Sequence, residues 1–253
     1  MHPKRLDNIE LKRRTPNAEA PPAMEGMLQS IRTLAFRITK KLLNPKSVTS
    51  YGQGGEDLII ERLLEGKAKT LFYVDVGSND PIQRSNTYMF YLRGWSGVAI
   101  DGNPELIKKH KHIRPRDKAV CALVSDIEEI KTFTIFEDTC VSSANENQVR
   151  LMKNTRKISR EVRLKAKPLN AIFEELNIPS RFDLLSIDIE GNDYKALIGI
   201  NFSKYQPSAI VIEDHNFDPS NPHSSNIHTF LSARNYRLFS FAKPNLFYEL
   251  KIS

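Results

Sequence analysis

Short apolar runs that alternate with helical patterns constrain the fold of this chain more than any other feature. Five such runs occupy 71–76, 98–100, 119–124, 184–189 and 209–212. Their apolar residues mostly follow one another instead of alternating with polar ones, which is typical of parallel strands covered on both faces. The segments between them, 56–65, 85–93, 104–111, 169–176 and 193–198, carry helical patterns. This alternation predicts an α/β fold, a doubly wound sheet with helices on both faces.

The last part of the chain departs from this alternation. Apolar stretches at 236–241 and 246–250 are separated by Ala242-Lys243-Pro244-Asn245, which predicts an antiparallel hairpin. A hairpin that closes a parallel sheet argues against a plain dinucleotide-binding fold, and with it against a nicotinamide-dependent dehydrogenase. The stretch 137–167 is polar and weakly patterned, so it forms either a lid over a site or a surface insertion.

The basic character of the chain is concentrated at its start. Of the net charge of +7 over 253 residues, the first 50 residues contribute +6, from ten Lys or Arg and four Asp or Glu. We therefore expect a basic tail over 1–48 and one domain over 49–253. Apolar residues at three- and four-residue steps predict an amphipathic helix at about 24–43, which either lies on an anionic membrane surface or packs on the domain. The near-neutral domain argues against a nucleic-acid partner.

The sequence also predicts where the protein works. Its apolar runs are far shorter than the roughly 20 residues that cross a bilayer, and no secretory leader pattern is visible. Its two cysteines, Cys121 and Cys140, cannot form a disulfide framework or a four-cysteine zinc site. We expect a cytoplasmic protein, with peripheral membrane contact through 24–43 as an additional possibility.

The segment 74–80, Val-Asp-Val-Gly-Ser-Asn-Asp, is the first that predicts a ligand site. An apolar strand ends there in a turn whose single glycine, Gly77, permits a close backbone approach, and ligands of open α/β sheets bind at such strand ends. The turn lacks the three glycines of a dinucleotide fingerprint, and its acids disfavour a pyrophosphate. A ligand without phosphate, such as S-adenosylmethionine, suits it better. The alternative is a capped turn with no ligand.

Asp101 ends the next strand, 24 residues beyond Gly77. An acid at this place can accept hydrogen bonds from both hydroxyls of a ribose. The alternative is that Asp101 only stabilises the turn before the helix that begins near Pro104.

Two further groups of acids end the later strands. Asp188 and Glu190 follow an apolar run and could orient a substrate hydroxyl, remove its proton or hold a divalent metal; the alternative is helix capping. Glu213, Asp214 and His215 end the following run, and His215 is either a general base or a structural histidine. If a metal is present, we expect Asp188 with Glu213 or Asp214 to bind it.

Seven segments in order carry a resemblance to a known family: 52–57 (GQGGED), 72–77 (FYVDVG), 85–87 (SNT), 93–97 (RGWSG), 114–117 (RPRD), 185–191 (LSIDIEG) and 207–213. Over roughly 50–250 the chain resembles the FkbM family of class I S-adenosylmethionine-dependent methyltransferases. The resemblance implies a Rossmann-like seven-stranded sheet and O-methylation of a hydroxyl, often on a sugar or glycan. Two alternatives to this function are a nucleic-acid methyltransferase and a non-catalytic membrane-surface module.

The resemblance also implies roles for single residues. Asp75 and Gly77, with Ser78 and Asn79 of the same turn, would line the methionine part of the donor, and Asp101 its ribose. Ala122 to Ser125 would border the adenine, and Asp188 would lie near the transferred methyl group. Asp188, Glu190 and His215 are then the candidate catalytic residues, and the acceptor is a small molecule or glycan. The turn Gly77-Ser78-Asn79-Asp80 replaces the glycine-rich loop of typical class I enzymes, so backbone contacts there cannot be transferred.

Overall fold

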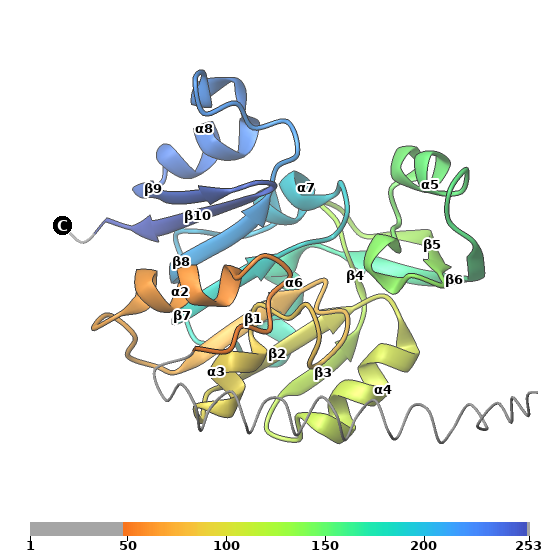
Figure 1. The fold of residues 1–253 in the computed structure, drawn as a ribbon, viewed down its shortest axis with the longest axis horizontal. Coiled ribbons are helices and arrows are strands. Elements are labelled where there is room, and N and C mark those ends of the chain that lie inside the picture. Colours follow the sequence, from red (N-terminus) through yellow and green to blue (C-terminus); the bar gives the residue numbers. More distant parts are fainter. Residues whose placement is uncertain (1–47, 252–253) are drawn as a thin grey trace, which may run out of the picture. The chain divides into compact units, whose positions relative to one another are not determined.

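The computed structural model describes residues 48–251, and the compact unit within it begins at Ser50. Its centre is a seven-stranded sheet with the order β3-β2-β1-β7-β8-β10-β9 (Figure 1). The strands are β1 (Phe72–Val76), β2 (Ser96–Asp101), β3 (Lys118–Cys121), β7 (Arg181–Ile187), β8 (Gln206–Glu213), β9 (Tyr236–Ala242) and β10 (Asn245–Leu250). Strand β10 runs antiparallel to β8 and β9, whereas the pairs from β3 to β8 are parallel. The predicted mostly parallel sheet and C-terminal hairpin are confirmed.

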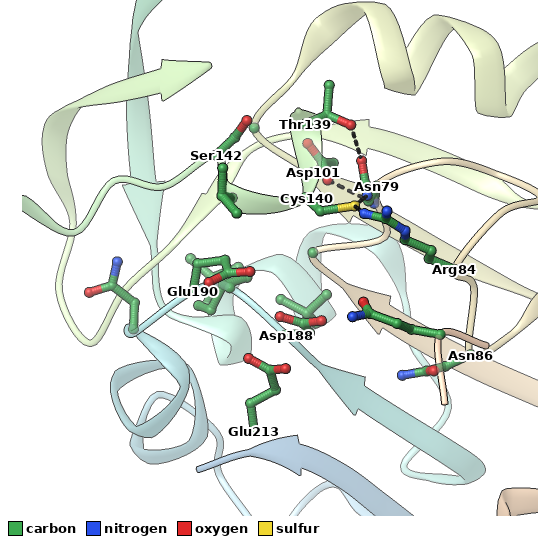
Figure 2. A pocket seen from close by; sticks show the side chains of 18 of the residues that line it. Asn79, Arg84, Asn86, Asp101, Thr139, Cys140, Ser142, Asp188, Glu190 and Glu213 are labelled. Atoms are coloured by element: carbon green, nitrogen blue, oxygen red, sulfur yellow. Dashed lines mark hydrogen bonds between the residues drawn. The ribbon is translucent and has the colours of Figure 1, made fainter. Parts of the chain in front are cut away.

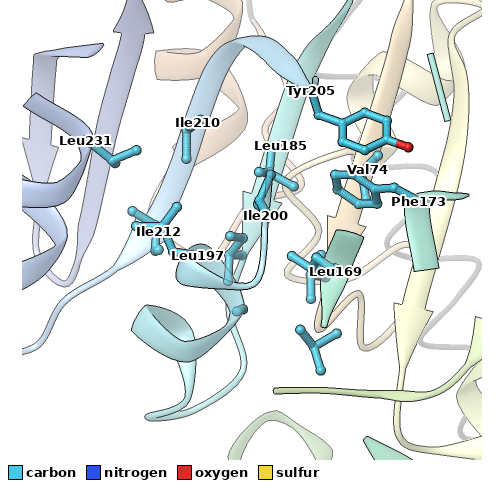
Figure 3. Packing of buried hydrophobic residues seen from close by; sticks show 14 of the residues in the cluster. Val74, Leu169, Phe173, Leu185, Leu197, Ile200, Tyr205, Ile210, Ile212 and Leu231 are labelled. Carbon is cyan, nitrogen blue, oxygen red and sulfur yellow. The ribbon is translucent and has the colours of Figure 1, made fainter. Parts of the chain in front are cut away.

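Helices cover both faces of this sheet, because successive strand residues are apolar on both sides. Val74, Leu185 and Ile210 face one core, which is completed by α6 (Leu169–Leu176), α7 (Asp193–Ile198) and α8 (Asn226–Ser232) (Figure 3). Tyr73 and Val211 face a second core with α2 (Glu56–Leu64) and α3 (Tyr88–Leu92). A further helix, α4 (Pro104–Ile113), follows β2. Burial on both faces explains the uninterrupted apolar runs.

A second, three-stranded sheet was not predicted. It has the order β4-β6-β5, from β4 (Leu123–Val124), β5 (Glu129–Phe136) and β6 (Ile158–Lys167). The run expected to be one strand over 119–124 breaks at Ala122, so that β3 stays in the large sheet while β4 joins the small one. Between β5 and β6 lie a short 3-10 helix, Thr139–Val141, and α5 (Glu146–Met152). The weakly patterned stretch 137–167 is therefore mostly ordered into elements.

The basic tail and the amphipathic helix expected at 24–43 lie outside the described residues, so contact with a membrane surface stays a prediction. Among residues 48–251, no helix has the length and apolar character needed to cross a bilayer.

Candidate active site

A cavity of about 660 Å³ opens at the carboxyl ends of the parallel strands. This volume falls in the range of roughly 300–1,000 Å³ that is usual for small-molecule sites. The turns after β1, β2, β7 and β8 line one side of it, and the segment after β5 lines another (Figure 2). The topology places the cavity where open α/β sheets bind their ligands.

The turn after β1 reaches the cavity through Gly77 and Asn79. Gly77 has a φ of +80°, a conformation that favours glycine, and its N–H donates to the carbonyl of Ile100 at 2.9 Å. The N–H of Asp188 donates to the carbonyl of Val76 at 2.9 Å, which extends the pairing of β1 and β7 beyond both strands. The three strand ends are thus tied together at the floor of the cavity.

Asp101 lines the cavity with a carboxylate that is held in place by the backbone. Its oxygens accept hydrogen bonds from the N–H of Asn79 at 2.9 Å and of Asn103 at 2.7 Å. Burial raises its pKa to about 6, although these two hydrogen bonds oppose the shift. Each oxygen retains a lone pair for a ligand. Asp101 therefore stabilises the turn before α4, as the alternative interpretation expected, and still offers acceptors to the cavity.

Next to Asp101 the lining becomes apolar, with Ala122, Leu123, Val124, Phe133 and Val141. Ala122 is thus part of the cavity wall, and its place beside an adenine stays a prediction. Ser125 does not line the cavity, because its hydroxyl bonds Asp126 at 3.1 Å and Glu129 at 3.2 Å.

Asp75 and Ser78 also differ from the expectation that they line the donor site. Ser78 is buried behind the turn and is absent from the cavity lining. Asp75 accepts a hydrogen bond from the Thr87 hydroxyl at 2.6 Å, and Thr87 in turn accepts one from Arg114 at 2.8 Å. Asp75 therefore belongs to a buried network beneath the site. Desolvation raises the pKa of this carboxyl despite its hydrogen bond and the nearby guanidinium.

Arg114 is the centre of that network and has no exposed surface. Its guanidinium donates to the Pro81 carbonyl and the Ser85 hydroxyl, both at 2.7 Å, and lies 3.7 Å from Asp117. It thereby fixes the segment after β1, which carries the cavity residues Arg84 and Asn86. Sequence reasoning noted Arg114 only within the RPRD segment of the family resemblance.

Asp188, Glu190 and Glu213 gather at the other end of the cavity (Figure 2). Burial, followed by repulsion between the carboxylates, raises the pKa of Asp188 and of Glu213 well above the ordinary range. Burial raises the pKa of Glu190 to about 7. The carboxylate of Asp193 accepts hydrogen bonds from the N–H of Ile189 and Gly191 and so fixes the loop that carries Glu190. Carboxylates with raised pKa values can exchange protons near neutral pH.

His215 joins this cluster, whereas Asp214 does not. The Nε2 atom of His215 lies 3.3 Å from Oε2 of Glu213. Asp214 instead accepts hydrogen bonds from the Ser225 hydroxyl at 2.6 Å and the Asn216 N–H at 3.0 Å, and it does not line the cavity. The expected metal site of Asp188 with Glu213 or Asp214 is corrected on this point, because Asp214 serves the loop before α8.

The comparisons with known proteins agree with this geometry. A family model described as the methyltransferase FkbM domain matches residues 75–238, about two thirds of the chain. The chain belongs to the FkbM methyltransferase family. A comparison with curated proteins found no match. The matched segment of this methyltransferase contains Asp101, Asp188, Glu190, Glu213 and His215, and it ends within β9.

The FkbM domain also builds a cavity wall from the stretch 137–167, which the sequence left open as a lid over a site or a surface insertion. Residues 138–142, together with Ala144, line the cavity, and the Sγ atom of Cys140 accepts hydrogen bonds from Asn79 at 2.8 Å and Arg84 at 2.9 Å. The Thr139 hydroxyl donates to Asn79 at 2.8 Å (Figure 2). These contacts join segments about 60 residues apart, so no local pattern could have revealed them. Glu56 also lines the cavity, and its only signal in the sequence is its place in the GQGGED segment.

Proposed function

We propose that this FkbM methyltransferase uses S-adenosylmethionine to methylate a hydroxyl oxygen of a sugar or glycan-bearing small molecule. The observation that carries the proposal is that one cavity joins two chemically different ends. Asp101 and an apolar lining form one end, and Asp188, Glu190 and Glu213 form the other.

The first end suits the adenosine part of the donor. The free lone pairs of Asp101 match the two ribose hydroxyls, and Leu123 and Phe133 match an adenine ring. The carboxylates at the second end suit a ligand that carries a sulfonium and an ammonium group. When bound, the donor supplies an electrophilic methyl carbon for in-line displacement, for which the protein mainly aligns the two reactants and excludes water.

The second end suits the acceptor. A hydroxyl must lose its proton as its oxygen attacks, and we assign that proton to Asp188, which lies beside the turn of Gly77. The amides of Asn86, Asn192 and Asn245 line the same cavity and can both donate to and accept from several hydroxyls, which favours a polyhydroxylated acceptor.

A transfer assay tests the proposal. The 253-residue chain is incubated with S-adenosylmethionine labelled in the methyl group and with sugars, glycans, lipid-linked glycans, and DNA and RNA oligonucleotides. We expect label on a hydroxyl-bearing sugar or glycan, and an O-methyl signal in the NMR spectrum of the product. Label on an oligonucleotide alone would favour the alternative of a nucleic-acid methyltransferase. No binding of the donor to the chain would refute the function as a whole.

A further inference from the structure

Glu190, Glu213 and His215 offer the atoms of a metal site. One carboxylate oxygen of each glutamate and one ring nitrogen of His215 all lie within 4.8 Å of one another. Glu190 belongs to the loop between β7 and α7, and the other two residues belong to the end of β8 and the loop after it. All three line the cavity beside Asp188. The cluster therefore combines two oxygens and one nitrogen from two segments of the chain that meet beside the cavity.

A second observation points to a ligand at that point. The Glu213 side chain is only 10% exposed, and no N–H or hydroxyl of the described residues donates to its buried Oε2 atom. Asp188 can form a hydrogen bond with Glu213 only while one of the two acids keeps a proton. His215 Nε2 lies 3.3 Å away, but not in hydrogen-bonding geometry. A buried polar atom without a partner is costly, so nearly all such atoms in folded proteins are paired with a protein group, a water or an ion.

Among the described residues, no lysine or arginine side chain fills this role. Within residues 48–251, no lysine or arginine nitrogen lies within 4.0 Å of the carboxylate oxygens of Asp188, Glu190 or Glu213. The cavity arginines Arg84 and Arg156 are instead directed to Asp138, at 3.6 and 3.8 Å, and Lys243, which also lines the cavity, forms no ion pair with the three carboxylates. The carboxylates of the cluster are therefore left for a cation from outside the chain.

We propose that Glu190, Glu213 and His215 bind one divalent cation. A mixed set of carboxylates and imidazole suits Mn²⁺ and related transition-metal ions better than Ca²⁺, which prefers six to eight oxygens. Three protein ligands leave coordination positions open toward the cavity, as in catalytic sites. The role of the cation rests on the proposed function: it polarises the acceptor hydroxyl, whose proton passes to Asp188 as the O–CH₃ bond forms and the S–CH₃ bond breaks.

The test measures metal binding without any methyl transfer. The chain is stripped with a chelator and titrated with MnCl₂, and free Mn²⁺ is followed by its EPR signal. We expect one Mn²⁺ per chain. His215→Ala should weaken binding at least about 10-fold, since even the loss of an outer-shell partner costs about 10- to 100-fold. His215 is exposed, so this substitution should leave the fold intact. His112→Ala, which removes an exposed histidine of α4 outside the cavity lining, is the matched control and should bind like wild type.

Two results would overturn the site: wild type that binds no Mn²⁺ up to about 1 mM, or His215→Ala that binds it as tightly as wild type does. Glu190→Gln tests a second proposed ligand independently and should also weaken Mn²⁺ binding. Titration of S-adenosylmethionine into the same preparations separates this proposal from the proposed function. Intact donor binding without Mn²⁺ binding refutes the metal site alone, and Mn²⁺ binding without donor binding refutes the proposed function alone.

Discussion

The backbone of Gly77 lies directly against the main-chain carbonyl of Asp188. A Cβ atom at position 77 would lie 1.7 Å from that oxygen, far inside contact distance. The turn that carries Asn79 and the loop that carries the proposed base can therefore meet only if position 77 has no side chain. One glycine thus fixes how closely the turn of Asn79 approaches the loop of Asp188.

We expect Gly77→Ala to lower the free energy of unfolding by at least about 3 kcal/mol, because steric overlap adds to the cost of a positive φ. Gly66→Ala is the matched control. Its φ is +69°, and a Cβ there would meet nothing within 4 Å, so it should cost only about 1–2 kcal/mol. Urea denaturation measures both. Equal losses for the two variants would show that the contact with Asp188 does not constrain the turn.

Arg114→Met should destabilise the protein by about 3–5 kcal/mol, the usual cost of removing one partner from a buried charged network. The loss removes a compensating charge from the buried acids Asp75 and Asp117 and removes the hydrogen bond to Ser85. Urea denaturation again measures the effect. The control is Arg93→Met, which removes an exposed ion pair to Glu61 at 2.7 Å and should cost less than about 1 kcal/mol. A similar small loss for both variants would contradict the role given to Arg114.

The sequence could predict the site residues that end strands. In a parallel sheet all carboxyl ends meet at one edge, so Asp101, Asp188 and Glu213 had to converge once the strands were recognised. Strand geometry explains why Asp75 does not line the cavity as expected. It alternates with Val74 and Val76, which face one core, so its side chain points to the opposite face, where Thr87 and Arg114 lie. Alternation along β1 would have shown this.

One part of the cavity wall could not be predicted from the sequence, and one strand could have been predicted but was missed. The contacts of Cys140 with Asn79 and Arg84 depend on tertiary structure and leave no local pattern. Strand β6 did leave one: Val162, Leu164 and Ala166 alternate with charged residues and pack in the core of the small sheet. This period of two is the signal of a half-buried strand, and a polar composition obscured it.

His110 predicts a pH dependence of stability. Burial, assisted by the charge of Arg114 and opposed by that of Asp80, lowers its pKa to about 4. Because the unfolded chain then binds a proton at a higher pH than the native state does, the native state is fully favoured above about pH 6.5 and loses stability as pH falls toward 4. At pH 5 the loss from this residue is about 2 kcal/mol.

His110→Gln should remove this dependence. The stability difference between wild type and variant should shrink by about 2 kcal/mol from pH 7 to pH 5 in urea denaturation. Asp101, which also titrates in this window, is present in both proteins and cancels. His112→Gln, on the exposed side of the same helix, should retain the wild-type dependence. A pH-independent difference for His110→Gln would show that His110 is not held neutral in the folded protein.

Asp188→Asn tests the chemistry. The substitution keeps the size of the side chain but removes its basicity, so turnover should fall at least about 100-fold, while donor affinity changes much less. Initial rates at saturating donor and a donor titration measure the two effects. Asp218→Asn serves as the control, because Asp218 is exposed and lies outside the cavity lining. If the variant turns over at close to the wild-type rate, Asp188 is not the base, and Glu190 or His215 must be tested for that role.

Calorimetric titration of S-adenosylmethionine into the protein tests the central claim most directly, with wild type, Asp101→Asn and the control Asp218→Asn. Asp218, like Asp101, accepts a hydrogen bond from a backbone N–H, that of Ser220 at 2.9 Å. The control therefore makes the same chemical change outside the cavity. We expect one donor per chain, a loss of about 30- to 1,000-fold for Asp101→Asn, equivalent to roughly 2–4 kcal/mol, and no loss for Asp218→Asn. Unchanged affinity in Asp101→Asn would contradict the assignment of this cavity to the methyl donor.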